Sequence, residues 1–100
     1  MTFMNEDTPP LQVEIDEAVS RGVYTNLALL THSETEFILD FLFIQPQTPK
    51  TKVLTRLVTS PVHAKRLLAA LQDNLAKYET RFGPIAAGDQ ATRQKTGIYQ

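Results

Sequence analysis

The sequence predicts an α+β fold with the order β-β-β-β-α, in which an antiparallel sheet of about four strands is followed by one long C-terminal helix. Two segments, residues 11–15 and 51–59, alternate apolar and polar residues with the period of a strand that is buried on one face. A third, FILDFLFI at residues 37–44, is apolar at every position except Asp40. From Ser60 to Gly83 the apolar residues instead recur every three or four positions, which is the period of a helix.

Turn signals separate the four predicted strands, which span residues 11–15, 23–32, 37–44 and 51–59. The segment Ser20-Arg21-Gly22 marks a turn after the first strand. The polar segment 33–36 contains no glycine, so a tight primed hairpin turn is not expected there. Pro46 and Pro49 predict a loop before the last strand.

The predicted helix has clear signals at both ends. Ser60 before Pro61 is typical of an N-cap followed by proline at the first helical position, and Gly83 before Pro84 is typical of a C-terminal cap. Between the caps lies an apolar stripe that consists of Ala64, Leu68, Leu71, Leu75, Tyr78 and Phe82. The opposite face is polar, which predicts an amphipathic helix of about six turns.

We expect a single α+β domain over residues 11–83. Residues 1–10 are polar and end in two prolines, which predicts a disordered N-terminus. Residues 84–100 are mostly small and polar and have no hydrophobic period, which predicts a flexible tail.

The charged residue within FILDFLFI has a natural partner in the last strand. An antiparallel register that sets Asp40 opposite Arg56 also sets Leu42 opposite Leu54. The same register sets Phe43 opposite Val53, and a slip by one residue would lose all these matches because side chains alternate between the faces. Opposite charges directly across a ladder stabilise a sheet. We therefore interpret Asp40 and Arg56 as a structural ion pair, and Asp40 not as a catalytic acid.

The apolar surface exceeds what one chain of 100 residues can cover by itself. Four strands at a spacing of about 4.8 Å make a sheet about 19 Å wide, whereas one helix with its side chains is about 10 Å across. A second copy is the simplest cover, so we expect a homodimer or a higher homo-oligomer. The interface candidates are Ile38, Leu42, Ile44, Leu68, Leu71, Leu75 and Tyr78. Two arrangements fit the helix stripe, one against its own sheet and one against the second copy.

No group of residues indicates catalysis, a metal site or a cofactor. The chain has no cysteine, and its two histidines, His32 and His63, are not spaced as metal ligands. Ser60 lacks the sequence context of a nucleophile, and its capping role explains it. We therefore expect a non-enzymatic protein with no metal and no cofactor. The first residues do not resemble a signal peptide and no apolar segment is long enough for a bilayer, so we expect a cytoplasmic protein without a membrane partner.

Acidic and basic residues are unevenly distributed along the chain. Residues 1–40 contain eight acidic residues and one basic residue, and residues 41–100 contain three acidic and nine basic ones. This asymmetry fits a basic surface for an acidic partner, but we favour mutual neutralisation within the fold or between protomers. The basic residues around the start of the helix are Lys50, Lys52, Arg56, His63, Lys65 and Arg66. They lack the interleaved aromatic residues of single-strand readers, so nucleic-acid binding is not favoured.

Several short motifs carry a family resemblance. They are Tyr24-x-Asn26, Glu36-Phe37-x-x-Asp40-Phe41, a proline loop before a basic strand, Ser60-Pro61-x-x-Ala64-Lys65, and the helix end from Lys77-Tyr78-Glu79 to Phe82-Gly83. Through them the chain resembles, over roughly residues 11–85, a family of short bacterial proteins known only as a domain of unknown function. This resemblance implies no activity. The order of strands followed by one long helix is also similar, at the level of the fold alone, to the SecB export chaperone.

These observations favour a non-enzymatic, oligomeric protein-interaction or structural module, whose partner is a second copy or another protein. One alternative is a SecB-like chaperone that binds extended polypeptide on apolar grooves. A second alternative is a nucleic-acid accessory protein. Suppression of the aggregation of an unfolded client tests the first alternative, and a salt-sensitive gel shift tests the second.

Overall fold

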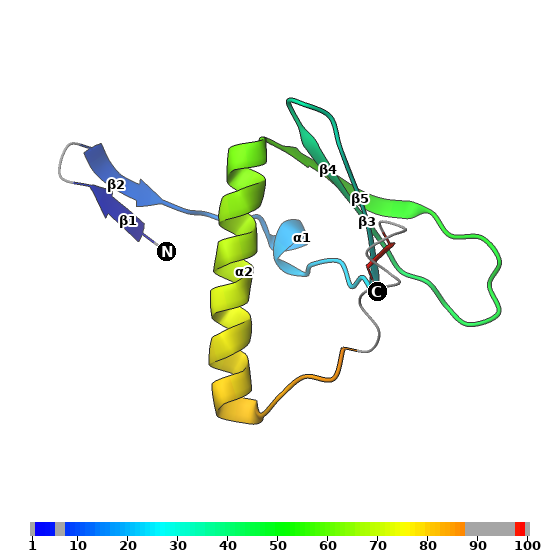
Figure 1. Ribbon diagram of the computed structural model, residues 1–100. Helices are drawn as coiled ribbons and strands as arrows, with labels where there is room; N and C mark the ends of the chain where they lie inside the picture. Colours follow the sequence, from blue (N-terminus) through cyan, green and yellow to red (C-terminus); the bar gives the residue numbers. More distant parts are fainter. Residues whose placement is uncertain (1, 6–7, 88–97, 100) are drawn as a thin grey trace.

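The computed structural model describes residues 2–5, 8–87 and 98–99 of the chain. Its elements are β1 (Thr2–Asn5), β2 (Thr8–Gln12), α1 (Glu17–Ser20), β3 (Leu27–His32), β4 (Phe37–Leu42), β5 (Val53–Thr59), α2 (Pro61–Phe82) and β6 (Ile98–Tyr99). An antiparallel sheet is followed by a long helix, which is the α+β class that the sequence predicts (Figure 1).

The main sheet has the strand order β5-β4-β3-β6, and each neighbouring pair is antiparallel. The turn between β3 and β4 is closed by Ser33, whose backbone N–H donates to the carbonyl oxygen of Glu36 at 2.9 Å. The hydroxyl of Ser33 accepts from the amides of Thr35 at 3.3 Å and Glu36 at 3.2 Å. The serine hydroxyl thus accepts from the amides of the two residues before the next strand. In this way the turn closes without a glycine, which the segment 33–36 does not contain.

The β4–β5 ladder has the predicted register along most of its length. Asp40 lies opposite Arg56, and Leu39 lies opposite Leu57. Since a one-residue slip would exchange the two faces of the sheet, the charged pair and the apolar pairs specify the same alignment.

The ladder departs from the predicted register at its end. Beyond Phe41 the register shifts, so that Leu42 lies opposite Val53, and β4 ends before Phe43. The predicted pairings of Leu42 with Leu54 and of Phe43 with Val53 are therefore wrong. Leu54 is the extra residue of the irregularity, and a bulge of this kind lengthens one strand by a residue and bends it.

The fourth strand of the main sheet is not the predicted segment 11–15. The strand that includes Leu11 ends at Gln12 and pairs with β1 in a separate two-stranded sheet, while β6 takes the place beside β3. Val13 is 54% exposed and Ile15 is 65% exposed, because neither residue belongs to a paired strand. An alternating pattern becomes a strand only where a neighbouring strand can pair with it.

Both ends of the chain contain strands that the sequence does not predict. β1 and the first residues of β2 fall within residues 1–10, for which the sequence predicts disorder. In the predicted tail, residues 84–87 are in neither helix nor strand and residues 98–99 form β6, whereas 88–97 and 100 lie outside the described residues. The proposed domain limits at residues 11 and 83 stay predictions.

The core formed by the described residues is very small. Among residues 10–87, for which burial is described, only Leu42 and Asp40 are buried, with exposed fractions of 4% and 7%. The Cα radius of gyration is 16.6 Å, compared with about 13 Å for a compact domain of this length. The accessible area of 9144 Å² exceeds the area of about 5,700 Å² that a folded monomer of this mass exposes. A single copy therefore leaves an unusual amount of surface uncovered.

Helix α2 contributes most clearly to this uncovered surface. None of its residues is buried, and Leu68, Leu71 and Phe82 are 56%, 55% and 64% exposed. Figure 1 shows α2 running away from the end of β5, with the sheet on one side in this view and the β1–β2 hairpin on the other. The apolar stripe of α2 therefore does not pack on the sheet of the same chain, which was one of the two arrangements that fit it.

Candidate functional site

Asp40 and Arg56 form a bidentate ion pair across the β4–β5 ladder. Nε of Arg56 donates to Oδ1 of Asp40 at 2.7 Å, and Nη2 donates to Oδ2 at 2.9 Å. The hydrogen bond from Arg56 is the main reason why the pKa of Asp40 lies below its ordinary value; burial opposes the shift and the charge of Arg56 adds to it. Because both carboxylate oxygens accept from the guanidinium, the pair is a structural cross-link of the sheet.

The two predicted helix caps are occupied by the expected atoms. The hydroxyl of Ser60 accepts from the backbone N–H of His63 at 3.1 Å, and proline follows at the first helical position. At the other end Gly83 has φ 96°, a conformation that favours glycine, and its N–H donates to the carbonyl oxygen of Glu79 at 2.9 Å. Ser60 therefore has a capping role in the fold.

Asn26 extends the β3–β4 pair beyond the ends of the two strands. Its Nδ2 donates to the carbonyl oxygen of Ile44 at 2.9 Å, and its Oδ1 accepts from the N–H of Ile44 at 2.8 Å. The carboxamide thus takes the place of a backbone peptide group in the ladder. Sequence reasoning does not assign this role, because the contact joins positions 18 residues apart and depends on the register.

The two histidines lie in different surroundings. The ring of His32 stacks on Phe37 with 5.2 Å between the ring centroids, and His63 lies exposed in the first turn of α2. In the described ranges no three His, Cys, Asp or Glu residues come close enough to hold a metal ion. The histidines therefore do not build a common site.

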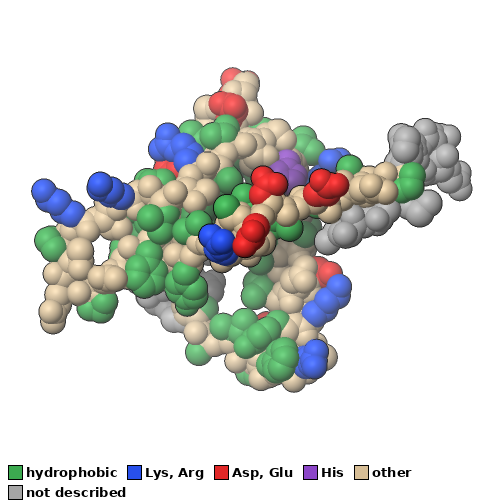
Figure 2. Space-filling view, turned by 180° about the vertical axis from the view of Figure 1, so that it is seen from behind, with side chains coloured by type: hydrophobic (Ala, Val, Ile, Leu, Met, Phe, Trp, Pro, Cys, Tyr) green, Lys and Arg blue, Asp and Glu red, His purple; other side chains and the backbone are tan. Residues whose placement is uncertain are grey.

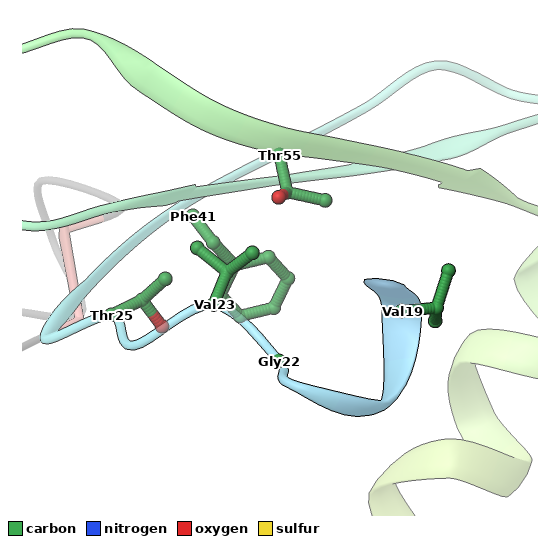
Figure 3. A pocket seen from close by; sticks show the side chains of 6 residues that line it. All are labelled: Val19, Gly22, Val23, Thr25, Phe41 and Thr55. Carbon is green, nitrogen blue, oxygen red and sulfur yellow. The ribbon is translucent and has the colours of Figure 1, made fainter. Parts of the chain in front are cut away.

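An open apolar hollow of about 330 Å³ lies between the α1 region and the sheet (Figure 3). It is lined by Val19, Gly22, Val23, Thr25, Phe41 and Thr55. Phe41 and Thr55 come from the neighbouring strands β4 and β5, and Val19 comes from α1. The lining offers two hydroxyl groups and no ionisable side chain, so its chemistry suits an apolar side chain and not acid–base catalysis.

The interface candidates in the sheet are partly used within the chain. Leu42 is buried because it lies in a central strand between Leu27 of β3 and Val53 of β5. It is therefore unable to contribute a surface to a second copy, and we withdraw it from the predicted interface. Ile38 and Ile44 are half-buried.

The interface candidates on α2 are all exposed. Leu68, Leu71, Leu75 and Tyr78 retain between 42% and 56% of their accessible area. Together with Ala64 and Phe82 they form one line along the helix, which we call the α2 stripe. In Figure 2 hydrophobic side chains gather at the lower end of the molecule, where Figure 1 places the C-terminal end of α2, and an opening is visible above this end. The α2 stripe is the candidate functional site.

The remaining surface gives two further findings. Arg56, one of the basic residues near the helix start, is bound to Asp40, which reduces the charge available to an anionic ligand. Over the described part of the chain, no helix has the length and apolarity that crossing a membrane requires.

The sequence comparisons agree with the motifs. Residues 1–87 match the family described as a protein of unknown function (DUF3467), so the chain belongs to this family. Comparisons with curated proteins and with solved structures give no match.

Proposed function

We propose that this member of the DUF3467 family is a non-enzymatic protein-interaction or structural module that assembles with further copies of itself. The observation that carries the proposal is the α2 stripe, which is apolar and continuous along the helix and is exposed at every residue except the half-buried Ala64. Helices in globular proteins gain most of their stability from packing an apolar face. A helix that leaves its apolar face in water therefore favours assembly.

The area of the chain supports the same proposal. The accessible area exceeds that of a compact monomer of this mass by about 3,400 Å². A standard protein–protein interface covers only about 800 Å² on each partner. The uncovered area is therefore larger than one such interface needs.

A charge in the α2 stripe tests the proposal. Leu71→Glu places a carboxylate in the middle of the stripe, and we expect it to lower the mass of the assembly measured by light scattering. Arg66→Glu introduces the same side chain outside the stripe and is the matched control, which should keep the native mass. Circular dichroism of both variants checks that α2 is still helical. Equal masses for the two variants and the native chain contradict a role of the stripe in assembly.

Chaperone-like binding of extended polypeptide is a second candidate, and the position of β5 at the edge of the sheet favours it. An edge strand offers backbone donors and acceptors to an added strand. Leu57 and Val58 of β5 are 49% and 52% exposed, so apolar contacts are available beside these groups. The native protein should then suppress the aggregation of an unfolded client, and Leu57→Lys should weaken this effect. A native protein without any such effect excludes this candidate.

A further inference from the structure

The spacing of the α2 stripe is that of a helix-pairing seam. Its six residues follow one another at alternating intervals of four and three positions along the 22 residues of α2. This spacing keeps one line of side chains facing a partner helix over the whole length. The ion pair between Nζ of Lys77 and Oδ2 of Asp73, at 3.0 Å, lies outside this line. The helix therefore presents a seam with an apolar centre and a charged outer face.

We propose that α2 pairs with α2 of a second copy in an antiparallel arrangement that is symmetric about residue 73. This inference rests on the proposed self-assembly and adds the partner segment, its direction and its register. In this register Ala64 of each copy faces Phe82 of the other, and Leu68 faces Tyr78 and Leu71 faces Leu75 in the same way. Each of these contacts therefore occurs twice in the pair. A two-fold axis through the middle of the helix pair relates each contact to its symmetry-equivalent copy.

Side-chain size favours the antiparallel direction. The smallest residue of the seam, Ala64, then lies opposite the aromatic residue at the other end, Phe82. A parallel pair in register would set alanine against alanine at one end and phenylalanine against phenylalanine at the other. Such a pair would leave a void in one layer and overfill another, and both defects are destabilising in a packed interface.

The charges beside the seam favour the same direction. One position after a seam residue stand Lys65, Gln72 and Glu79, which form one flanking row. In antiparallel helix pairs this row faces its own counterpart, so Lys65 of each copy faces Glu79 of the other, and Gln72 faces Gln72. A parallel pair would instead set Glu79 beside Asn74 and leave Lys65 without an acidic partner.

The carboxylate of Glu79 has two oxygens, and only one of them is needed for its hydrogen bond within the chain. Its Oε2 accepts from the backbone N–H of Ile85 at 2.8 Å, which fixes the side chain near the C-terminal end of the helix. Lys65 is exposed at the opposite end. The two charges are far apart within one copy and come together only when a second helix runs the other way.

Distances between spin labels on the outer face of α2 test the direction and the register. The chain has no cysteine, so single cysteines at Arg66, Asp73 and Thr80 can be labelled selectively. These three positions are seven residues apart, lie on one row of the helix and are exposed. In the proposed pair the two labels at Asp73→Cys lie at the same height along the pair, on its two outer sides. At Arg66→Cys and Thr80→Cys the labels are displaced along the axis by about 21 Å, because fourteen residues at about 1.5 Å each separate them.

The expected result is that the interspin distance at Asp73→Cys is the shortest of the three, and that the distances at Arg66→Cys and Thr80→Cys are longer and similar to each other. Three equal distances indicate a parallel pair and overturn the inference, while the proposed self-assembly stands. A dimeric mass with three unequal distances in any other order indicates that another surface or register forms the dimer and overturns the inference in the same way. A monomeric mass of the unlabelled protein overturns both the inference and the proposed function.

Discussion

Nε of Arg56 lies 2.7 Å from Oδ1 of Asp40, directly across the ladder between β5 and β4. The two partners differ in exposure, since the side chain of Asp40 is 10% exposed and that of Arg56 is 60% exposed. Loss of Arg56 therefore leaves an almost buried carboxylate without its partner, whereas loss of Asp40 leaves a guanidinium that water can solvate. This asymmetry decides how the pair responds to substitution.

We expect Arg56→Met to lower the urea midpoint more than Asp40→Asn does. The reason is that an unpaired carboxylate in a buried place destabilises the fold more than an unpaired guanidinium in water. The double variant Asp40→Leu/Arg56→Met removes both charges and should recover part of the loss. Urea unfolding followed by circular dichroism measures the three midpoints, at one protein concentration because assembly affects stability. Equal midpoints for Arg56→Met and the double variant contradict this explanation.

Stability should fall as the pH is lowered through the acidic range. The pKa of Asp40 in the folded chain lies below the ordinary value of 3.8, so the unfolded chain takes up a proton at a higher pH than the folded chain does. The contribution of the ion pair is complete above the ordinary pKa and is lost as the pH falls toward the lowered one. Urea midpoints over this range should show the loss in the native protein and a weaker one in Asp40→Asn. The same pH slope in both proteins excludes Asp40 as its source.

Ser60→Ala should lower the free energy of unfolding by about 1 kcal/mol, the usual effect of removing an N-cap side chain. The reason is that the N–H of His63 loses the hydroxyl that accepts from it. Ser60→Asn keeps an acceptor at this position and is the control. Urea unfolding should place Ser60→Asn near the native protein, and an equal loss in both variants contradicts the capping role.

The charges beside the α2 stripe should control self-association. Lys65→Glu sets two acidic residues against each other at both ends of the antiparallel pair and should raise the dissociation constant about tenfold, because four weak terms of a few tenths of a kcal/mol change together. Lys65→Glu/Glu79→Lys restores opposite charges and should restore association. Arg66→Glu is the control, since it makes the same change of charge on the outer face of the helix, away from the partner. Sedimentation equilibrium measures the constants, and a double variant as weak as the single one contradicts the register.

Much of the fold could be predicted because its signals are local. The caps at Ser60 and Gly83 and the three-and-four spacing between them predict α2 with the bounds that the structure has, Pro61–Phe82. The alignment of β4 with β5 could be predicted because the register that sets Asp40 opposite Arg56 also pairs apolar residues on both sides of them.

The remaining features depend on contacts between distant parts of the chain. The strand Ile98–Tyr99 is too short for a hydrophobic period, and it is a strand only because it pairs with Ala28 and Leu29. The shift at Leu42 comes from an extra residue in β5, which no single residue type indicates.

The candidate site could be predicted only in part. The α2 stripe is evident from spacing, but its exposure depends on the direction in which the helix leaves β5. A single residue, Ser60, stands between the end of β5 and the start of α2, and its extended backbone directs the helix away from the sheet. This direction is a property of the three-dimensional connection, so the sequence left both arrangements of the stripe open.

The central claim is that a second copy covers the α2 stripe, and the mass of the native protein in solution tests it most directly. Light scattering after size exclusion, over a series of micromolar concentrations, should give at least twice the chain mass of 11.2 kDa. A mass of one chain, 11.2 kDa, throughout this series contradicts the claim.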